Sequence, residues 1–484
     1  MTKKANSVKI NYIYNVAYQL LLILAPLITS PYISRKLGPD MIGQQSYCYS
    51  IATYFMLFIM LGVANYGNRC VAKVRENRKE LSQTFWTIYG FQCLRAIVVL
   101  TTYILFVLFF EQKYSLIALV NGIYVFSGFF DISWLFFGLE QFRLTVPVNF
   151  IVKIFNIIAL LLFIRQPSDI WKYSLIIGSV ALISNCILWF YLKRFVDWYK
   201  PSFKEFLPHI KPEIILFVPV IAVSLYKVMD RIMLGALSTS TEVGFYTQAE
   251  SIVNLPMSLI TSLGTVMLPR ISHLISKGDI DSTKKYIESS ISFAMMLAFA
   301  MAFGLSAIAP TFAPTFFGEE YVPCSALIIG LSITIIFISW ANIIRTQYLI
   351  PNAKDKSYLI SIVTGAIVNL CINFSLIPRF ASIGAVVGTV CAEGVVCFIQ
   401  TFMVHKELPI KKYINIASPF FIMGIVMFGA VRGVSVLIQQ PYLQIGMQLL
   451  VGIAVYGGLL IIYSYMFDSF VAKTIQNILK RVLK

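Results

Sequence analysis

The chain has 484 residues, of which 58% are hydrophobic and 13% are charged. Because a water-soluble domain averages about 25% charged residues, this composition excludes a soluble enzyme and indicates a protein that crosses a membrane many times. The net charge of +17 does not point to a nucleic acid, since lysine and arginine collect in the cytoplasmic loops of membrane proteins. We therefore expect membrane lipids among its partners, and no nucleic acid.

Apolar windows of about 20 residues predict fourteen transmembrane helices and an all-α polytopic fold. Their approximate limits are 11–34, 42–68, 84–110, 115–139, 144–164, 171–191, 213–236, 245–271, 287–309, 322–350, 357–377, 383–404, 413–436 and 442–466. With both termini in the cytoplasm, the inner segments hold 27 lysines and arginines and the outer segments hold 6. This bias predicts a multi-pass protein with cytoplasmic termini.

Reactive side chains are sparse in the loops. The eight cysteines and three histidines show no spacing typical of metal ligands, so we expect no metal site and no disulfide. No loop exceeds about twenty residues, and no G-x-x-x-x-G-K-[ST] nucleotide-binding motif is present. We therefore expect a protein that is not an enzyme and has no catalytic residue. We also expect no cofactor, while coupling to H⁺ or Na⁺ stays open.

The longest cytoplasmic connection carries Pro201, Pro208 and Pro212 and follows six spans. It predicts a joint between two lobes. The predicted division is an N-lobe over 1–195, a cytoplasmic linker over 196–212, a C-lobe over 213–404, and an extra hairpin with an amphipathic basic tail over 405–484.

An internal repeat supports two related lobes. Residues 37–51, LGPDMIGQQSYCYSI, are similar to residues 234–252, LGALSTSTEVGFYTQAESI, and aligning Gly43 with Gly244 also pairs Ser50 with Ser251. Six spans separate the copies, and because six is even, both copies have the same orientation. The repeat therefore predicts two parallel six-helix lobes, which could provide alternating access by rocking.

Charged residues inside spans mark candidate sites, because each costs about 2.5–3.5 kcal/mol on insertion scales. The candidate substrate-binding cations of a cavity are Lys227, Arg231, Lys153, Arg95 and Arg345. The candidates for ion coupling or for salt bridges are Asp131, Asp230, Glu250 and Glu393.

Three of these residues have helical spacing. Lys227, Asp230 and Arg231 lie at i, i+3 and i+4, so they share one face of a continuous helix. Its net positive charge suits an anionic ligand such as a phosphate, and a purely structural salt-bridge cluster is the alternative. For Arg345, which lies near the end of its span, the alternative is a side chain that extends to the membrane interface.

Three stretches carry a family resemblance. They are SPYISRKLGPDMIGQQSYCYSI (30–51), FSGFFDISWLFFGLEQFRL (126–144) and the run from Leu349 through the eleventh and twelfth spans. They resemble Wzx-type polysaccharide flippases of the multidrug/oligosaccharidyl-lipid/polysaccharide exporter superfamily. The most specific piece is Asp131-Ile132-Ser133-Trp134 followed by Gly138-Leu139-Glu140.

The resemblance implies a MATE-like, V-shaped bundle of two six-helix lobes plus a C-terminal two-helix hairpin in the bacterial inner membrane. It implies that the substrate is an oligosaccharide repeat unit linked to undecaprenyl pyrophosphate, which alternating access moves from the cytoplasmic to the outer leaflet. The product would be O-antigen, capsule or exopolysaccharide. Polysaccharide polymerase or assembly proteins are the implied partners, and the oligomeric state stays open.

Three alternatives compete with this interpretation. An ion-coupled, MATE-like exporter of small molecules would be favoured by an acidic cavity, whereas cations exceed acids in these spans. A lipid II flippase would carry arginines in its first two spans, which here hold none before Arg35 at the exit of the first span. A membrane-bound polymerase or ligase would need a large outer loop with catalytic cations, and the outer segments here are too short.

Overall fold

The structure is a computed structural model that describes residues 2–466, 471–473 and 476, with side chains from Leu21 onward except those of 22, 23, 219, 226, 227, 263, 265 and 266. Within these residues the chain is helical and contains no strand. The first helices are α1 (Thr2–Met60), α2 (Val63–Val74), α3 (Arg78–Phe109), α4 (Ser115–Ser127), η1 (Gly128–Phe130), α5 (Ser133–Gly138), α6 (Phe142–Phe163), η2 (Pro167–Asp169), α7 (Ile170–Leu192), α8 (Phe203–Lys227) and α9 (Met229–Leu237). They are followed by α10 (Ser240–Ser276), α11 (Ile280–Phe317), η3 (Glu319–Tyr321), α12 (Cys324–Ile344), the π-helix η4 (Arg345–Leu349), α13 (Asp355–Val404), α14 (Ile410–Leu437) and α15 (Pro441–Met466).

Twelve stretches of the described chain are long and apolar enough to cross a membrane, so the protein is a multi-pass membrane protein. Two of them, with 51 and 50 residues, are more than twice the length that one crossing needs. The backbone leaves helical geometry inside both, at Gly38 (φ 75°) in α1 and at Ala381 (φ 48°) in α13. Both α1 and α13 therefore consist of two successive helices, and in the first long stretch α2 follows as a third. With α1 and α13 each divided in two, the twelve stretches accommodate the fourteen predicted crossings.

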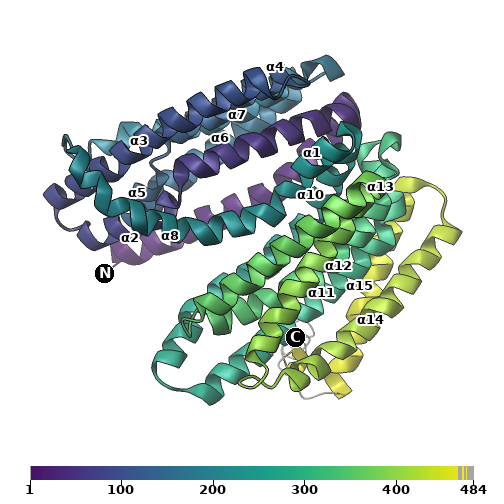
Figure 1. Cartoon of the computed structure of the whole chain (residues 1–484). Helices are drawn as coiled ribbons and strands as arrows, with labels where there is room; N and C mark the ends of the chain where they lie inside the picture. Colours follow the sequence, from purple (N-terminus) through teal and green to yellow (C-terminus); the bar gives the residue numbers. More distant parts are fainter. Residues whose placement is uncertain (1, 467–470, 474–475, 477–484) are drawn as a thin grey trace. The chain divides into compact units, whose positions relative to one another are not determined.

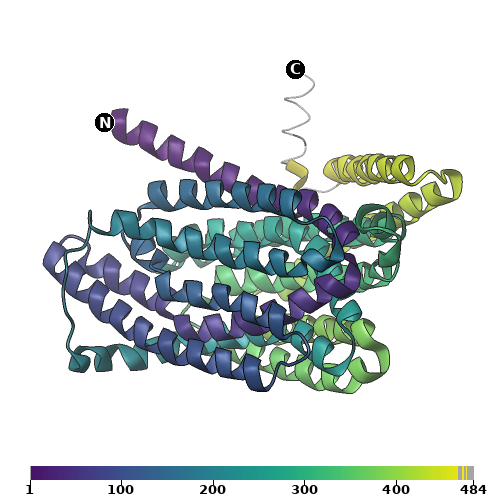
Figure 2. The same ribbon diagram turned by 90° about the horizontal axis from the view of Figure 1, so that it is seen from above.

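The chain forms two compact units, Met1–Gly244 and Phe245–Lys484. In the first unit, α1 packs against α3, α4, α6 and α9, and α8 packs against α2 and α3 (Figure 1). In the second unit, α11 packs against α12, α14 and α15, and α14 and α15 run side by side as the predicted hairpin (Figure 2). The predicted amphipathic tail lies largely outside the described residues.

The range 196–212, which is predicted as a cytoplasmic linker, contains the start of a helix. Helix α8 already begins at Phe203, where Ser202 and Glu205 form a capping box that satisfies the first backbone amides. Because α8 and α9 pack against helices of the first six spans, they belong to the first compact unit. The predicted division into N-lobe, linker, C-lobe and hairpin stays a prediction.

A buried aromatic core holds α2, α3 and α5 together. Trp134 of α5 and Phe85 of α3 are fully buried, and their ring centroids lie 5.5 Å apart. A Cβ atom on Gly67 of α2 would lie 2.5 Å from the Trp134 ring, so only glycine lets the helix approach the indole this closely. The tryptophan of the sequence motif at 131–134 thus has a packing role.

The two copies of the sequence repeat meet within the first unit. A Cβ atom on Gly43 would lie 1.6 Å from the carbonyl oxygen of Ser240, and one on Gly244 would lie 2.0 Å from that of Pro39. In the alignment of Gly43 with Gly244, Pro39 is the counterpart of Ser240. Gly43 therefore contacts the counterpart of Pro39, and Gly244 contacts the counterpart of Ser240. A pseudo-two-fold relation between the copies requires such a reciprocal contact.

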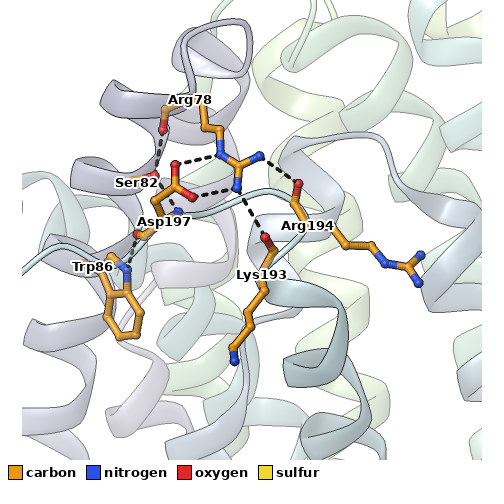
Figure 3. A network of polar contacts seen from close by, with 6 residues as sticks. All are labelled: Arg78, Ser82, Trp86, Lys193, Arg194 and Asp197. Atoms are coloured by element: carbon orange, nitrogen blue, oxygen red, sulfur yellow. Dashed lines mark hydrogen bonds and ion pairs between the residues drawn. The ribbon is translucent and has the colours of Figure 1, made fainter.

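The connection after α7 is tied to the beginning of α3 (Figure 3). The Arg78 guanidinium donates to both carboxylate oxygens of Asp197 at 2.7 Å, and it also donates to the carbonyl oxygens of Lys193 and Arg194. The Trp86 indole N–H donates to the main-chain carbonyl of Asp197 at 2.9 Å. These bonds satisfy carbonyls beyond the last turn of α7 and fix the path of the chain towards α8.

We expect this network to depend on pH through Asp197. The bonds from Arg78 hold the pKa of Asp197 below its usual range, so the interaction is present above the ordinary aspartate pKa and is lost as the pH falls through the lowered value. Arg78→Gln should therefore speed amide hydrogen exchange over 193–199 several-fold at neutral pH. The difference from the wild type should vanish at a pH low enough to protonate Asp197. Lys79→Gln, one residue along the same helix, is the control, and equal exchange in Arg78→Gln and Lys79→Gln would contradict the expectation.

Candidate functional site

A buried ion pair lies at the junction of α1, α3 and α8. The Arg95 guanidinium of α3 pairs with the carboxylate of Glu213 of α8, and its Nε donates to the main-chain carbonyl of Ile59 at 3.2 Å. The guanidinium also stacks over the Phe91 ring, 4.3 Å from its centroid. The Glu213 side chain is fully buried and that of Arg95 is 11% exposed. Both charges are therefore desolvated, and each is compensated chiefly by the other.

The end of α1 creates the space for this pair. Leu61 and Gly62 have positive φ values of 36° and 80°, so α1 ends and α2 begins in a new direction. A Cβ atom on Gly62 would lie 2.8 Å from the main-chain oxygen of Glu213. The absence of a side chain at this turn lets the backbone of α8 approach α1, which brings Glu213 to Arg95.

A second polar network lies three residues earlier in α3. The fully buried Gln92 side chain donates from Nε2 to the main-chain oxygens of Gly128 and Asp131, each at 2.9 Å, and its Oε1 accepts from Trp134 Nε1 at 3.2 Å. The Asp131 carboxylate accepts from the amide of Ser133 at 3.0 Å. Asp131, a candidate for ion coupling, thus starts the turn into α5, and the network stabilises the break between α4 and α5.

The predicted cluster of Lys227, Asp230 and Arg231 does not lie on one continuous helix. Helix α8 ends at Lys227, Val228 has a φ of −114°, and α9 begins at Met229. Asp230 is buried, Arg231 is half-buried, and the side chain of Lys227 lies outside the described residues. The i, i+3, i+4 spacing places three side chains on one face only in a continuous helix. Here the helix is interrupted at Val228, between Lys227 and the other two residues.

The other predicted cations lie in separate places. Lys153 is half-buried in α6 and has neither an ion pair nor a hydrogen bond within the described part of the chain. Arg345 begins the π-helix η4, and its guanidinium lies 5.7 Å from the centroid of the Tyr358 ring. π-Helical turns are rare and occur often at functional sites. Lys153 belongs to the first unit and Arg345 to the second.

The remaining predicted acids lie in the second unit. Glu393 is buried in α13, and Glu250 is half-buried in α10. Within the described residues, no group of three or more histidine, cysteine, aspartate or glutamate side chains could hold a metal ion. None of the eight cysteines, all of which lie among the described residues, forms a disulfide bond.

Sequence reasoning missed Glu213. Its predicted span begins at residue 213, so the glutamate was assigned to the membrane boundary. The structure places it ten residues inside α8, opposite Arg95, which is 118 residues earlier in the chain. The capping box at Ser202 and Glu205 is the local signal that would have moved the helix start, and Arg95 would then have indicated a buried acid as its partner.

Relatives of this chain carry transport names. A protein of Escherichia coli (strain K12), named as an O-antigen transporter, is 22% identical over 406 residues, which cover 83% of this chain and 97% of the relative. A Haloferax volcanii protein, named as a flippase of low-salt glycan biosynthesis, is 23% identical over 292 residues, which cover 60% of this chain and 61% of the relative.

Solved structures share the fold. The lipid II flippase MurJ in an inward closed conformation has a TM-score of 0.76 at 15% identity, with 94% of this chain and 99% of that chain covered. An inward-facing multidrug resistance transporter of the MATE family has a TM-score of 0.62 at 12% identity, with 80% of this chain and 95% of that chain covered. At these identities the likeness shows the fold alone, which is MATE-like.

The sequence profile of the family described as "Polysaccharide biosynthesis protein" matches residues 8–275, more than half of the chain. The family match, the named relatives and the MATE-like fold confirm the resemblance to Wzx-type proteins of the exporter superfamily. The chain belongs to the polysaccharide biosynthesis protein family.

Proposed function

We propose that this protein is a flippase for a lipid-linked oligosaccharide. The observation that carries the proposal is the similarity to an O-antigen transporter along 97% of that relative's length. A second relative is named as a glycan flippase, and neither name describes an enzyme. The cargo is the repeat unit of a surface polysaccharide, and undecaprenyl pyrophosphate is its lipid carrier. Transfer runs from the cytoplasmic to the outer leaflet of the bacterial inner membrane by alternating access, with both termini in the cytoplasm.

The intramembrane cations support an anionic cargo. Lys153 has no anionic partner within the described residues, and an uncompensated cation in a membrane is costly unless a ligand or water contacts it. A pyrophosphate group supplies such a partner. We therefore assign cargo binding to Lys153, and we keep Arg231, Lys227 and Arg345 as further candidates from the sequence.

Two other functions share the fold. A lipid II flippase and a multidrug exporter both have the MATE-like arrangement. At this low sequence identity, however, the likeness does not indicate which substrate this chain transports. The cation excess in the spans argues against a small-molecule exporter of organic cations, because like charges repel in a low-dielectric cavity.

Cells depleted of this protein provide the test. We expect one complete oligosaccharide-linked polyprenyl pyrophosphate to accumulate and the surface polymer to disappear, as shown by mass spectrometry of extracted lipids. Lys153→Ala should lower surface polymer at least about fivefold through loss of charge complementarity, whereas Lys153→Arg should retain most of it. A normal lipid profile with intact polymer, in a strain without a second flippase, would overturn the proposal.

A further inference from the structure

Three ionisable side chains form a row along one face of α8. Glu205, His209 and Glu213 are spaced by four residues, so successive side chains lie on the same face and about 6 Å apart along the axis. Glu205 and His209 are half-buried, whereas Glu213 is fully buried. The row therefore leads from the start of the helix, next to the connecting segment, to the ion pair with Arg95.

Each member of the row has a polar partner on a neighbouring element. The Tyr199 hydroxyl donates to both carboxylate oxygens of Glu205, at 3.1 and 3.0 Å. The Tyr66 hydroxyl of α2 lies 2.7 Å from Nδ1 of His209. Because Nδ1 is engaged with the tyrosine, Nε2 is the imidazole nitrogen that is left to exchange a proton.

Within the described residues, Arg95 is the cation that pairs with Glu213. Arg95 is the charged group that faces it from α3, where the Cys93 thiol lies beside the guanidinium. Helix α2 contributes Tyr66 and Cys70, which are neutral at neutral pH, and the exposed Lys73 lies beside Cys70. The main-chain oxygen of Ile59 in α1 and the backbone of Gly62 complete these surroundings. Asp230 and Arg231 are 17 and 18 residues farther along, in α9 beyond the interruption at Val228.

The ion pair is incompletely satisfied. Oε1 of Glu213 and one Nη atom of Arg95 have no hydrogen-bond partner within the described residues. A buried pair stabilises a protein only when further hydrogen bonds satisfy both groups, and an apolar pair of the same volume is often as stable. An intramembrane ion pair that leaves one polar atom open on each partner is therefore better explained by a function than by stability.

We propose that Glu213 is a proton-binding site whose occupancy controls whether the positive charge of Arg95 is compensated. A proton from water at the start of α8 binds Nε2 of His209 and then passes to the open Oε1 of Glu213, which leaves the imidazole neutral. Protonated Glu213 cancels the ion pair, so Arg95 carries one uncompensated positive charge. The movement involves a single proton and no redox step.

The uncompensated charge lets the site bind a second ligand besides the proton, an inference that rests on the proposed flippase function. An anionic group of phosphate chemistry can replace the lost carboxylate beside Arg95, because guanidinium binds phosphate oxygens with paired hydrogen bonds. Proton binding and anion binding then favour each other by the same factor, as linkage requires. This reciprocity would couple transfer of a pyrophosphate-linked cargo to proton uptake.

The proton site can be tested without any cargo. Infrared difference spectra of the purified full-length protein in nanodiscs are recorded between about pH 5 and pH 8. We expect a protonated-carboxyl band that appears on acidification in the wild type, persists in the control Glu80→Gln on an exposed position of α3, and is missing in Glu213→Gln. A band identical in wild type and Glu213→Gln would overturn the proton site and leave the flippase proposal intact.

Binding of undecaprenyl pyrophosphate by the same proteins tests the coupling. The wild type should bind at least about fivefold more tightly at pH 6 than at pH 8, and Glu213→Gln should bind tightly at both. The titration of the phosphate itself is common to all variants and cancels in the comparison. Equal pH dependence in wild type and Glu213→Gln would overturn the coupling. No binding by any folded variant at either pH would overturn the flippase proposal instead.

Discussion

Replacing Gly43 or Gly244 with alanine is expected to abolish surface polysaccharide and to lower the unfolding temperature. The added Cβ would lie 1.6 Å from the carbonyl oxygen of Ser240 or 2.0 Å from that of Pro39. Both obstacles are backbone atoms, which no rotamer change can move, so α1 and the start of α10 would have to separate. Overpacking of this kind typically costs about 1–3 kcal/mol, and here it would also disrupt the meeting point of the two repeat copies.

Glycine variants at uncrowded positions test whether the loss comes from the steric clash or from any replacement of a helical glycine by alanine. Gly429 and Gly433 of α14 have no heavy atom within 4 Å of an added Cβ. Their replacement by alanine should leave transport and stability unchanged or slightly improved, because alanine favours helix over glycine by about 1 kcal/mol. Transport is measured by surface-polymer staining and stability by thermal unfolding in detergent. Wild-type behaviour of Gly43→Ala would show that these helices are not in contact in the working protein.

Gln92→Leu should destabilise the first unit strongly. The substitution leaves the main-chain oxygen of Asp131 and the indole N–H of Trp134 without partners, and the main-chain oxygen of Gly128 keeps only the 3.5 Å bond from the Asp131 amide. Each buried unsatisfied group costs about 1–3 kcal/mol, so a total loss of about 2 kcal/mol or more is expected. Thermal unfolding in detergent and the yield of folded protein both measure this loss.

The control for this prediction is the same substitution at an exposed site of the same helix. Gln83 lies nine residues earlier in α3 and is exposed, so Gln83→Leu should melt like the wild type. If Gln92→Leu also melted like the wild type, the amide of Gln92 would have no part in holding the break between α4 and α5.

Local features of the sequence were sufficient for the transmembrane architecture. Long apolar runs produce helices because a backbone in lipid must satisfy its hydrogen bonds internally. The alignment of Gly43 with Gly244 identified the two copies of the repeat, whereas only the structure showed that the copies meet at these glycines. The break in α1 at Gly38 falls in the gap between the predicted spans 11–34 and 42–68. Glycine tolerates positive φ there, and the following Pro39 lacks the amide hydrogen that a helix needs.

The site depended on contacts that no local pattern encodes. Arg95 was recognised as a costly charge in a span, but its partner Glu213 is 118 residues away and becomes buried only when α8 packs against α1 and α3. Residues 203–212 form the first part of α8, a helix start that the prolines of this stretch did not indicate. The sequence by itself determined the helices, their number and their repeat, because lipid enforces local hydrogen bonding. Only the tertiary structure decided which charges are compensated, because ion pairing in a membrane depends on the distance between helices that are far apart in the chain.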